Sequence, residues 1–244
     1  MIDFTGKKFM VTGASSGIGR ATAILVSKLG AKIIACGRDE NRLDETLSKC
    51  EGNGHAKLAF DVRDTEKYNA IFNQAIADSK KFDGLIYSAG IAAPTPLRVF
   101  SEKTLREVLD VNLISFMMMV AMYSKRQFNN GGSIVAMSAL NAYYPHKCMS
   151  AYAASKMGLE GAVRTLAIEL ADKNIRINCV AAGPVDTPMT QGVLSATLEE
   201  NSKRTLLGMA QPEDVANMIV FLLSDLSKQI TGRSMYVDSG WLGQ

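Results

Sequence analysis

The sequence predicts an α/β fold: a doubly wound parallel sheet of about seven strands, Rossmann-like, with helices on both faces. Short apolar runs alternate with longer amphipathic stretches along nearly the whole chain. The apolar runs are rich in β-branched residues and do not alternate strictly with polar ones, as expected for strands covered on both faces. The chain has 244 residues, with no internal repeat and no linker rich in Pro, Gly or Ser, which favours a single domain over residues 1–244.

Seven short apolar segments are predicted to be strands: 8–12, 32–36, 57–60, 84–87, 133–137, 176–180 and 234–237. Helical patterns lie between them, at 18–30, from about Thr65, at 102–128 and at 151–170. Ligands of such sheets bind beyond the carboxyl ends of the strands. The residues that directly follow each strand are therefore the first candidates for function.

The composition argues against several classes of protein. Lys and Arg number 27 against 24 for Asp and Glu, a balance too even to predict binding to nucleic acid or to an acidic membrane surface. The most apolar run, 114–123, has about half of the ~20 residues that a bilayer requires, so we interpret it as a buried helix.

The cysteines and histidines also argue against particular classes of protein. The four cysteines are scattered without a C-x-x-C pair, which indicates reduced thiols in a cytoplasmic protein. The first predicted strand begins almost at once, so we expect no targeting segment. With only His55 and His146 present, a histidine-rich metal site is not expected.

A glycine-rich turn, TGASSGIG at 12–19, follows the first predicted strand and opens a helix. Gly13 allows a tight turn, Gly17 allows a ligand to approach the backbone, and Gly19 allows the helix to lie close to the strand. Free N–H groups and the positive end of the helix dipole favour a pyrophosphate. A purely structural turn is the alternative. The predicted cofactor contacts in this turn are Gly13, Ser15, Ser16, Gly17, Ile18 and Gly19.

The second and third strands each end in a residue suited to an adenosine. No acid follows the second strand, where an acid would bind the ribose of NAD(H), and Arg38 stands there instead. An arginine pairs well with a 2′-phosphate, which favours NADP(H) over NAD(H); a solvated arginine is the alternative. Asp61 could accept a hydrogen bond from an adenine amino group, or cap the helix that starts near Thr65.

The segment 151–170 places Tyr152 and Lys156 on one face of a predicted helix, four residues apart. A free phenol has a pKa of about 10. An adjacent ammonium favours the phenolate, so we expect a lowered pKa and a general acid–base usable near neutral pH. Small residues around the pair leave space for a cofactor and for a packed helix: Ala153, Ala154, Gly158, Gly161 and Ala162. Most Tyr-x-x-x-Lys pairs arise by chance, so the surrounding residues decide whether this pair is catalytic.

Two further polar residues supply that context. Ser138 directly follows the fifth strand and reaches the same edge of the sheet. Asn112 lies within the apolar stretch VLDVNLISF, where a buried amide needs hydrogen-bond partners. A structural hydrogen bond to the backbone is the plain interpretation of Asn112, and it is compatible with a catalytic role.

The ordered set of motifs resembles the short-chain dehydrogenase/reductase family, single-domain type, and is most similar to 3-oxoacyl-(acyl-carrier-protein) reductase-like members. The resemblance covers nearly the full length of the chain. The motifs are specific as an ordered set, although no single motif is. Its motifs are TGASSGIG at 12–19, DV at 61–62, SAG at 88–90, VN at 111–112, Ser138, YAASK at 152–156, IRIN at 175–178 and AAGPVDT at 181–187.

The resemblance implies the catalytic roles. Tyr152 would protonate a carbonyl oxygen or remove a hydroxyl proton, while Lys156 would lower the Tyr152 pKa and hold the nicotinamide ribose. Ser138 would hydrogen-bond the substrate oxygen, and Asn112 would position a water that passes protons to Lys156. Cofactor contacts are implied at Tyr152 and Lys156 as well, and further ones at Asp61, Val62, Ser88, Ala89, Gly90, Gly183, Pro184, Val185 and Thr187.

The sequence departs from the family pattern at four positions. Ser88 replaces an asparagine, which puts local rigidity in doubt. Ser16 stands where arginine is frequent in NADP-using relatives, which weakens the prediction of NADP(H). Met209 stands where arginine is usual, and Ser239 stands where glycine is common.

The region around the substrate is the least determined part of the sequence. We expect residues 187–211 to form a lid with apolar contacts from Met189, Val193, Leu194 and Leu198. Tyr143, Tyr144 and Pro145 line the pocket or pack beneath the lid, and His146 is polar lining or surface. The basic residues Lys125, Arg126 and Lys173 dock an acidic carrier protein or form a solvated face.

These features predict an NADP(H)-dependent oxidoreductase that acts on a ketone or secondary alcohol, such as a 3-oxoacyl thioester. The expected partners are a small carbonyl or alcohol substrate and an acyl carrier protein, and the resemblance implies a homotetramer. An NAD-linked sugar, polyol or steroid alcohol dehydrogenase is the first alternative. A non-catalytic scaffold that only binds the cofactor is the second.

Overall fold

One parallel sheet organises the whole chain. The computed structural model describes residues 2–144, 146–191 and 204–241. The strands are β1 (Lys8–Thr12), β2 (Lys32–Gly37), β3 (Ala56–Ala59), β4 (Phe82–Tyr87), β5 (Asn129–Ala139), β6 (Ile175–Ala182) and β7 (Ser234–Val237). Their order is β3-β2-β1-β4-β5-β6-β7, and neighbouring strands pair in parallel. All seven predicted strands are confirmed, β1 and β7 with the predicted bounds.

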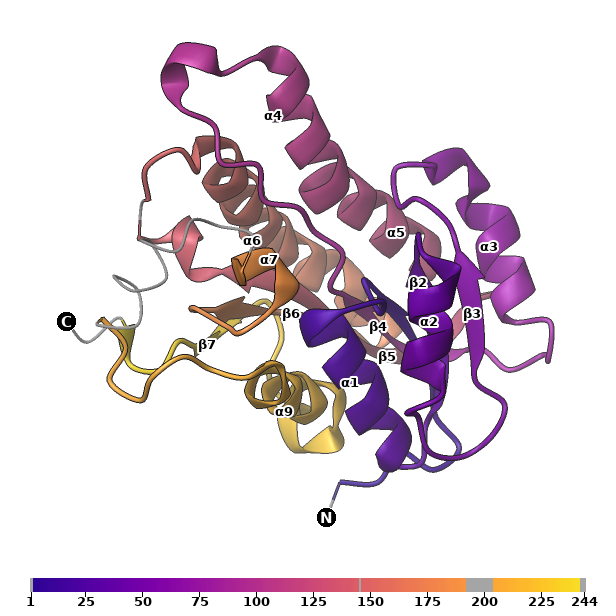
Figure 1. The fold of residues 1–244 in the computed structure, drawn as a ribbon. Coiled ribbons are helices and arrows are strands. Elements are labelled where there is room, and N and C mark those ends of the chain that lie inside the picture. The colour runs from indigo at the N-terminus through magenta and orange to yellow at the C-terminus, as the bar shows by residue number, and fades with distance from the viewer. Residues whose placement is uncertain (1, 145, 192–203, 242–244) are drawn as a thin grey trace.

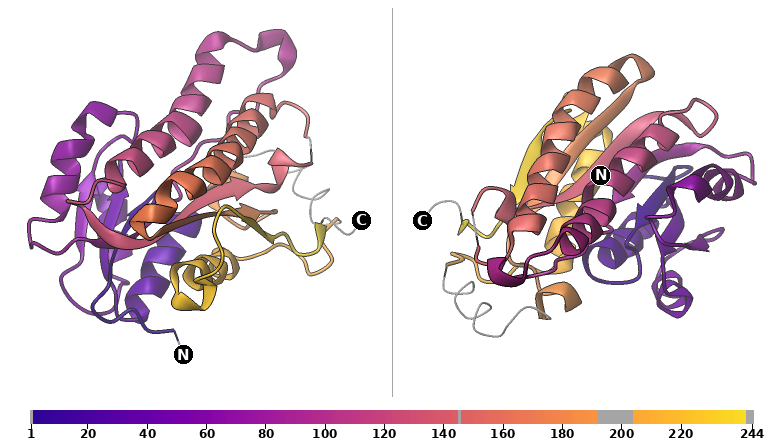
Figure 2. Two further views of the ribbon diagram at one scale, coloured as in Figure 1. Left: turned by 180° about the vertical axis from the view of Figure 1, so that it is seen from behind. Right: turned by 90° about the horizontal axis from the view of Figure 1, so that it is seen from above.

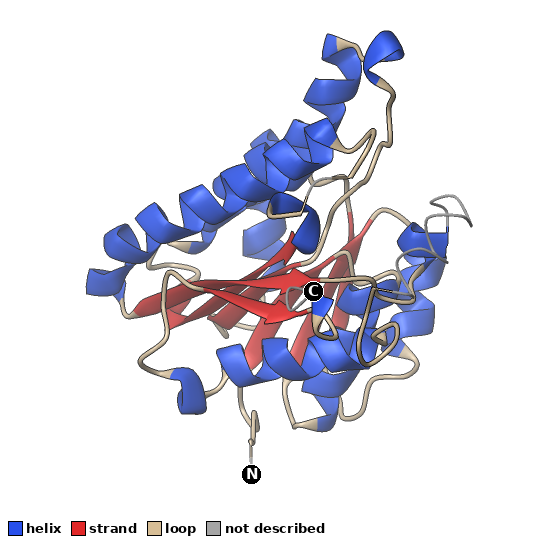
Figure 3. Ribbon diagram, turned by 90° about the vertical axis from the view of Figure 1, so that its left-hand side faces the viewer, coloured by secondary structure: helices blue, strands red, loops and turns tan. Residues whose placement is uncertain are grey.

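Helices cover both faces of this sheet, as the sequence predicts (Figure 3). The helices are α1 (Gly17–Lys28), α2 (Glu40–Leu47), α3 (Tyr68–Ala75), α4 (Glu102–Leu109), α5 (Ser115–Tyr123), α6 (Ser150–Leu170), α7 (Pro188–Gln191) and α9 (Pro212–Leu223). Helices α1, α2 and α9 lie on one face, and α3, α5 and α6 lie on the other (Figure 1).

The two faces carry separate apolar cores. On the first face Val26 of α1, Leu43 of α2 and Ile219 of α9 are fully buried against the sheet. On the second face Phe72 of α3 and Phe116 of α5 are fully buried together with residues of α6. A sheet that is apolar on both sides has to be covered on both sides, which explains strands that read as continuous apolar runs.

The predicted helix at 102–128 is interrupted. It divides into α4, a π-helical turn over Asp110–Ile114, and α5, which ends at Tyr123. The π turn contains the buried Asn112, and π turns often mark functional positions. Figure 2 shows α4 and α5 running beside α6, with which they are in contact. The segment 114–123 is buried on one face only, since Met117 and Met118 remain exposed.

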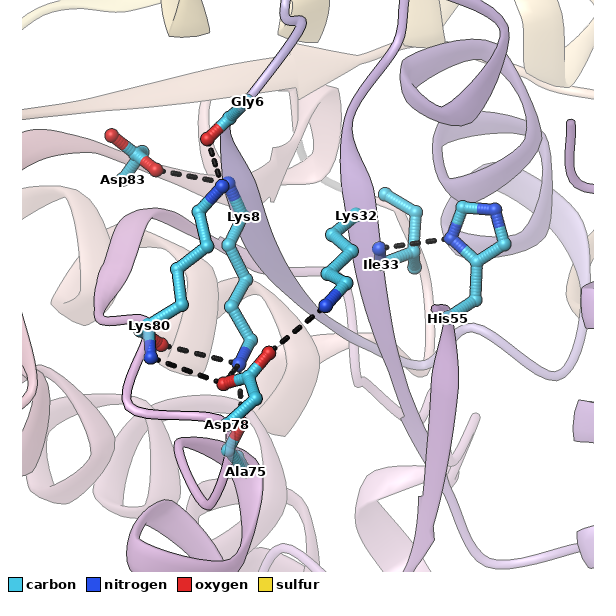
Figure 4. Close-up of polar contacts among 9 residues, drawn as sticks. All are labelled: Gly6, Lys8, Lys32, Ile33, His55, Ala75, Asp78, Lys80 and Asp83. Carbon is cyan, nitrogen blue, oxygen red and sulfur yellow. Dashed lines mark hydrogen bonds and ion pairs between the residues drawn. The ribbon is translucent and has the colours of Figure 1, made fainter. Parts of the chain in front are cut away.

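A buried lysine lies at the opposite end of the sheet from the carboxyl ends of the strands. Lys8, at the start of β1, is 1% exposed, and its Nζ donates to Asp78 and to the Ala75 carbonyl, both at 2.6 Å, and to the Lys80 carbonyl at 3.2 Å (Figure 4). Lys32 of β2 donates to the second Asp78 oxygen at 3.0 Å. This network joins β1 and β2 to the segment after α3.

The described residues contain neither a membrane-spanning helix nor a cluster of metal-binding side chains. No helix in these ranges is long and apolar enough to span a bilayer. In the same ranges, no three His, Cys, Asp or Glu side chains gather in a way that would hold a metal ion.

Candidate active site

The glycine-rich turn joins β1 to α1 and packs against the loop after β4. Gly13 has a φ of +67°, and a Cβ there would lie 2.7 Å from the Ser88 carbonyl oxygen. A Cβ at Gly19 would lie 2.3 Å from the Gly13 carbonyl oxygen. Only glycine lets these backbones approach so closely. The predicted roles of Gly13 in the tight turn and of Gly19 in close packing therefore agree with the structure.

The N-terminus of α1 is suited to an anion. Ser16 occupies the N-cap position in an extended conformation, and its side chain makes no capping hydrogen bond to the described first turn. The N–H groups of that turn point out of the helix end, where a phosphate would bind. Ile18 packs against the core, which anchors the turn. A Cβ at Gly17 would lie 3.2 Å from the Thr187 side chain, so two predicted contacts from distant parts of the chain meet here.

The residues after β2 and β3 form the predicted adenosine end of the site. Arg38 is exposed, and the Ser15 hydroxyl lies 3.3 Å from the position of a Cβ on the neighbouring Gly37. Asp61 accepts two hydrogen bonds from the Arg63 guanidinium, at 3.0 and 2.7 Å. This pairing lowers the pKa of Asp61. Arg63 was not among the predicted site residues.

The alternative role predicted for Asp61, as a helix cap, is wrong. The 3₁₀ turn Thr65–Lys67 is preceded by Asp64, and the Asp61 side chain instead accepts from the backbone N–H of Arg63 at 2.9 Å. Val62 is buried in the core, and its carbonyl accepts a hydrogen bond from the Tyr68 hydroxyl. Val62 is only 9% exposed, so little of its surface remains for contact with a cofactor.

Backbone and side-chain hydrogen bonds fix the loop after β4. The N–H groups of Ser88 and Ala89 donate to Thr12 Oγ1 at 3.1 and 3.2 Å. Thr12 therefore supplies the rigidity that the replacement of asparagine by Ser88 put in doubt. Asn112 holds the next residue, since its Oδ1 accepts from the Ile91 N–H at 2.9 Å and its Nδ2 donates to the Ile91 carbonyl at 3.0 Å.

Asn112 also ties the π turn to α6. Its Nδ2 donates to Ser155 Oγ at 2.9 Å, and the amide is fully buried. The structural interpretation of Asn112 is confirmed. Its role in holding a water stays a prediction.

Lys156 lies where several predicted site residues meet. The side chain is 3% exposed, and Nζ donates to the Met137 carbonyl at 2.7 Å. A Cβ at Gly90 would lie 3.5 Å from this Nζ and 3.4 Å from Asn112 Oδ1. The Tyr152 ring centroid is 5.6 Å from the same Nζ. The Lys156 amine is thus hydrogen-bonded to β5 and lies close to both the loop after β4 and the candidate proton donor on α6.

The protonation equilibria of this pair differ from the prediction. Burial raises the pKa of Tyr152 to about 12, because the phenolate loses solvation. Burial lowers the pKa of Lys156 to about 8 for the same reason. The prediction that Lys156 lowers the Tyr152 pKa is therefore wrong for this structure. Nζ is directed at the Met137 carbonyl, and desolvation of the phenol is the cause of the shift in the Tyr152 pKa.

Ser138 is placed at the carboxyl end of β5, as predicted, and is 3% exposed. Its hydroxyl donates to Glu160 Oε1 of α6. The Tyr143 hydroxyl and Ser234 Oγ, the latter at 2.8 Å, donate to Oε2 of the same carboxylate. Glu160 was not among the predicted site residues, although its position four residues after Lys156 puts both on one helix face.

The aromatic residues after β5 pack rather than form an open lining. The Tyr143 ring lies 5.3 Å from that of Tyr236 on β7, which agrees with packing. Tyr144 is partly buried. His146 is partly buried beside Trp241, at 5.9 Å between ring centroids. Pro145 lies outside the described residues.

The loop after β6 is fixed at both ends of the predicted lid. Val185 is buried and pairs with Ala210, whose N–H donates to the Pro184 carbonyl at 3.1 Å. The Gly183 N–H donates to the Val237 carbonyl at 2.9 Å. Thr187 is 8% exposed, and its Oγ1 accepts from the Thr190 N–H. Met189 is exposed, whereas Val193, Leu194 and Leu198 lie outside the described residues.

The basic residues considered for carrier docking lie at the end of the sheet where the strands begin, opposite the carboxyl ends where the candidate site lies. Lys125 and Arg126 are exposed just before β5 begins, and Lys173 precedes β6. Ser138 is nine residues farther along β5, which corresponds to roughly 30 Å at ~3.3 Å per residue. The structure favours the alternative interpretation of a solvated face.

Comparisons with known proteins agree with this geometry. The family model described as Enoyl-(Acyl carrier protein) reductase matches residues 13–242. The chain is 35% identical to 3-oxoacyl-(acyl-carrier-protein) reductase FabG of Thermotoga maritima, over 96% of this chain and 97% of that protein. It is 31% identical to glucose 1-dehydrogenase of Gluconobacter oxydans, over 97% and 92%.

A solved structure shows the same fold. A dehydrogenase/reductase of Sinorhizobium meliloti superimposes with a TM-score of 0.91 and 29% identity, over 98% of this chain and 96% of that one. Similarity thus extends along nearly the whole chain in both sequence and structure. The chain belongs to the short-chain dehydrogenase/reductase family of oxidoreductases.

Proposed function

We propose that this protein is an NADP(H)-dependent reductase of a ketone, with Tyr152 as general acid and Ser138, Lys156 and Asn112 completing the catalytic group. The observation that carries the proposal is the position of Lys156 Nζ. It lies 2.7 Å from the Met137 carbonyl, beside Ser138, and 5.6 Å from the Tyr152 ring. The three side chains therefore share one corner at the carboxyl ends of the strands, where ligands of such sheets bind.

The protonation state of Tyr152 supports reduction. With a pKa of about 12 the phenol keeps its proton at neutral pH, which is the form that donates to a carbonyl oxygen. Ser138 would hydrogen-bond that oxygen once its hydroxyl turns away from Glu160, to which it donates its single proton in this structure. Lys156, with a pKa of about 8, exchanges its proton near neutral pH and would return one to the Tyr152 oxygen. A bound nicotinamide would supply the hydride.

The cofactor site fits a dinucleotide with a 2′-phosphate. The turn from Gly13 to Gly19 and the open N-terminus of α1 suit a pyrophosphate, with Thr187 beside them. The exposed guanidinium of Arg38 forms no ion pair within the described ranges and would bind a 2′-phosphate. Backbone groups of Gly183, Pro184 and Val185 would orient the nicotinamide, and the loops at 61–62 and 88–90 would flank the adenosine and the ribose.

The substrate class follows from the relatives. A 3-oxoacyl thioester is the proposed substrate and an acyl carrier protein the proposed partner, because the Thermotoga maritima relative is named for that reaction. The segment 187–211 would act as the lid over this substrate within a single domain. The cytoplasm, where reduced thiols persist, is the proposed location.

A second candidate is an NAD-linked dehydrogenase of a sugar, polyol or steroid alcohol. Two observations favour it. Ser16 leaves the glycine-rich turn without a basic side chain for a 2′-phosphate, and one relative is a glucose 1-dehydrogenase.

One panel of reactions tests both candidates. Purified protein is mixed with 3-oxoacyl thioesters, simple ketones, sugars and polyols, each with NADPH, NADH or their oxidised forms, and the absorbance of the reduced nicotinamide is followed. We expect turnover of ketones with NADPH at higher kcat/KM than with NADH. Equal efficiency with both cofactors would reject the NADP(H) preference. The absence of turnover with every pair would leave a protein that only binds the cofactor.

A further inference from the structure

Two arginines and one aspartate lie together where β2 and β3 end. The Phe60 N–H donates to the Gly37 carbonyl at 2.9 Å, so the residues that follow, Arg38 and Asp61, leave neighbouring strands side by side. A hydrogen bond from Arg63 is the main cause that lowers the pKa of Asp61, and the positive charge of Arg38 contributes to the same shift. Both arginines therefore lie near this one carboxylate.

The carboxylate of Asp61 is held by Arg63. The Arg63 guanidinium donates from Nε to Oδ1 at 3.0 Å and from Nη2 to Oδ2 at 2.7 Å, which is a bidentate contact. The backbone N–H of Arg63 also donates to Oδ1, at 2.9 Å. One residue thus engages both oxygens of the aspartate. The Arg63 side chain is 46% exposed, and ion pairs with such exposure contribute little to stability, so stability alone does not explain the contact.

Arg38 has no acidic partner in the part of the chain that the structure describes. The ion pairs there do not include it, and its side chain is exposed. The two acids that follow it have other partners. Asp39 accepts from the Arg42 N–H at 3.1 Å as the N-cap of α2, and Glu40 lies 3.6 Å from Lys57 Nζ. The Arg38 guanidinium is therefore available to an anion.

We propose that Arg63 is a positioning residue for cofactor specificity: by holding both oxygens of Asp61, it keeps Arg38 available for the 2′-phosphate of NADP(H). This role rests on the proposed function, in which Arg38 binds that phosphate. Without Arg63, the Asp61 carboxylate would pair with Arg38 and occupy the guanidinium that the phosphate needs.

Electrostatics gives this arrangement its effect on specificity. A phosphate monoester carries about two negative charges at neutral pH and binds best to a guanidinium whose N–H groups are not already used. Two arginines beside one aspartate leave a net positive charge at this end of the sheet. Loss of Arg63 would cancel that charge, and the released carboxylate would also repel the phosphate. Because Ser16 leaves the glycine-rich turn without a basic side chain there, the phosphate depends on Arg38.

The first measurement compares two cofactors that differ only in the 2′-phosphate. Dissociation constants of NADPH and NADH are measured by fluorescence titration for wild type and Arg63→Met. We expect the NADPH constant to rise by roughly three- to tenfold and the NADH constant to change by no more than about twofold. An equal rise for both cofactors would indicate a general structural role and would overturn the proposal.

A double-mutant cycle tests whether the effect passes through Asp61. In an Asp61→Asn background no carboxylate remains to pair with Arg38, so Arg63→Met should change the NADPH constant by no more than about twofold. The titrations are made at about 0.15 M salt, where a Debye length of ~8 Å screens the more distant charge effects of Arg63. A loss of equal size in both backgrounds would mean that Arg63 acts on the phosphate by itself, and would reject the proposed mechanism.

A matched control removes the same charge elsewhere. Lys7, which precedes β1 at the opposite end of the sheet, is 53% exposed and pairs with Asp83 at 3.1 Å. Lys7→Met should leave both dissociation constants unchanged, and a change equal to that in Arg63→Met would show that only the net charge of the protein matters. Thermal unfolding is followed for every variant. Should Arg63→Met fail to fold, Arg63→Gln also removes the charge and is expected to give the same shift in the ratio of the two constants.

A crystal structure gives a result that depends neither on affinity nor on turnover. In Arg63→Met, or in Arg63→Gln if that is the folded variant, we expect a nitrogen of Arg38 within ~4 Å of an Asp61 oxygen, the usual limit for an ion pair. An Arg38 side chain that stays away from Asp61 would overturn the proposal. A wild type that binds NADPH no more tightly than NADH would reject the NADP(H) preference itself. A wild-type preference that Arg63→Met leaves unchanged would reject only the role of Arg63.

Discussion

At the residue scale, burial controls the candidate proton donor more strongly than its charged neighbour. Tyr152 and Lys156 share a helix face, yet burial raises the pKa of the phenol to about 12 and lowers that of the amine to about 8. Both shifts favour the neutral forms, as expected where two ionisable groups leave water together. A neutral phenol is a hydrogen-bond donor at every physiological pH, which suits it to protonate a carbonyl oxygen.

The role of the phenol gives the first prediction. Tyr152→Phe removes the hydroxyl and keeps the ring, so cofactor affinity should not change. Loss of a general acid typically costs ~10²–10⁴ in rate, and kcat for ketone reduction should fall by at least that factor. Stopped-flow or steady-state absorbance of NADPH measures the rate, and fluorescence titration measures cofactor binding. Retention of most of the activity would show that another group donates the proton.

The second prediction concerns the titration of Lys156. With lysines labelled by ¹³C, one Cε resonance should titrate with a midpoint near pH 8, below the ~10.4 of a free lysine side chain. Lys156→Arg identifies that resonance by its disappearance. A midpoint above pH 10 would contradict the effect of burial.

The same shift affects stability. The folded pKa is depressed, so between about pH 8 and 10.4 the unfolded chain binds more protons than the folded protein at this lysine. Its contribution to the free energy of unfolding therefore rises with pH across that window. It is fully present above the unfolded pKa and is lost as the pH falls through 8.

At the element scale, the structure shows where local patterns succeed and where they fail. β1 and β7 have the predicted bounds because their apolar residues are flanked by turn residues. β5 begins four residues before its prediction because Asn129 pairs with β4 and Gly132 pairs with β6, and that pairing is set by tertiary contacts rather than by hydrophobicity. An apolar periodicity of 3.6 residues is that of a regular α-helix, so it cannot reveal the π turn around Asn112.

Contacts between distant segments were the part of the site that the sequence could not show. The order of motifs places Ser138, Tyr152 and Lys156 at one edge, because each follows or faces a strand end. The bonds from Ser138 and Ser234 to Glu160 join residues 22 and 74 positions apart. Similarly, Ser239 adopts a φ of +55° at a position where glycine is common, a strain that only the backbone reveals.

The third prediction concerns the ion pair that joins Lys8 of β1 to Asp78 in the segment after α3. Lys8 is 1% exposed, whereas Asp78 is 38% exposed. Asp78→Ala leaves a buried ammonium with only carbonyl partners, while Lys8→Met leaves a carboxylate that water can reach and that Lys32 still contacts. Because an uncompensated buried charge is the larger cost, Asp78→Ala should lower the free energy of unfolding more than Lys8→Met.

Urea unfolding followed by circular dichroism measures both variants against wild type. The hydrogen bonds from Lys8 and Lys32 outweigh burial and hold the Asp78 pKa below its usual value, so this carboxylate is ionised in the folded protein at neutral pH. A greater loss from Lys8→Met would mean that the lysine stem, rather than its charge, carries the interaction.

At the scale of the whole molecule, an apolar surface remains on the helical face that contains α5 and α6. Ile114 and Met118 are each 47% exposed, Met117 is 44% exposed, and Met157 on α6 is 37% exposed. The π turn, α5 and α6 that bear them lie close together (Figure 2). Exposed apolar side chains that gather on neighbouring helices are a feature of protein interfaces. Closed symmetric assemblies are the common outcome for soluble enzymes.

The fourth prediction is that the homotetramer implied by the family resemblance uses this face. Light scattering after size-exclusion chromatography should give four times the protomer mass. The paired substitution Met117→Glu with Met118→Glu puts charges into the patch, and desolvating them on assembly is unfavourable, so smaller species should appear. Asn41→Glu on the exposed side of α2 is the matched control and should leave the mass unchanged. A wild-type monomer would refute the assembly, and a tetramer that survives the paired substitution would place its interface on another face.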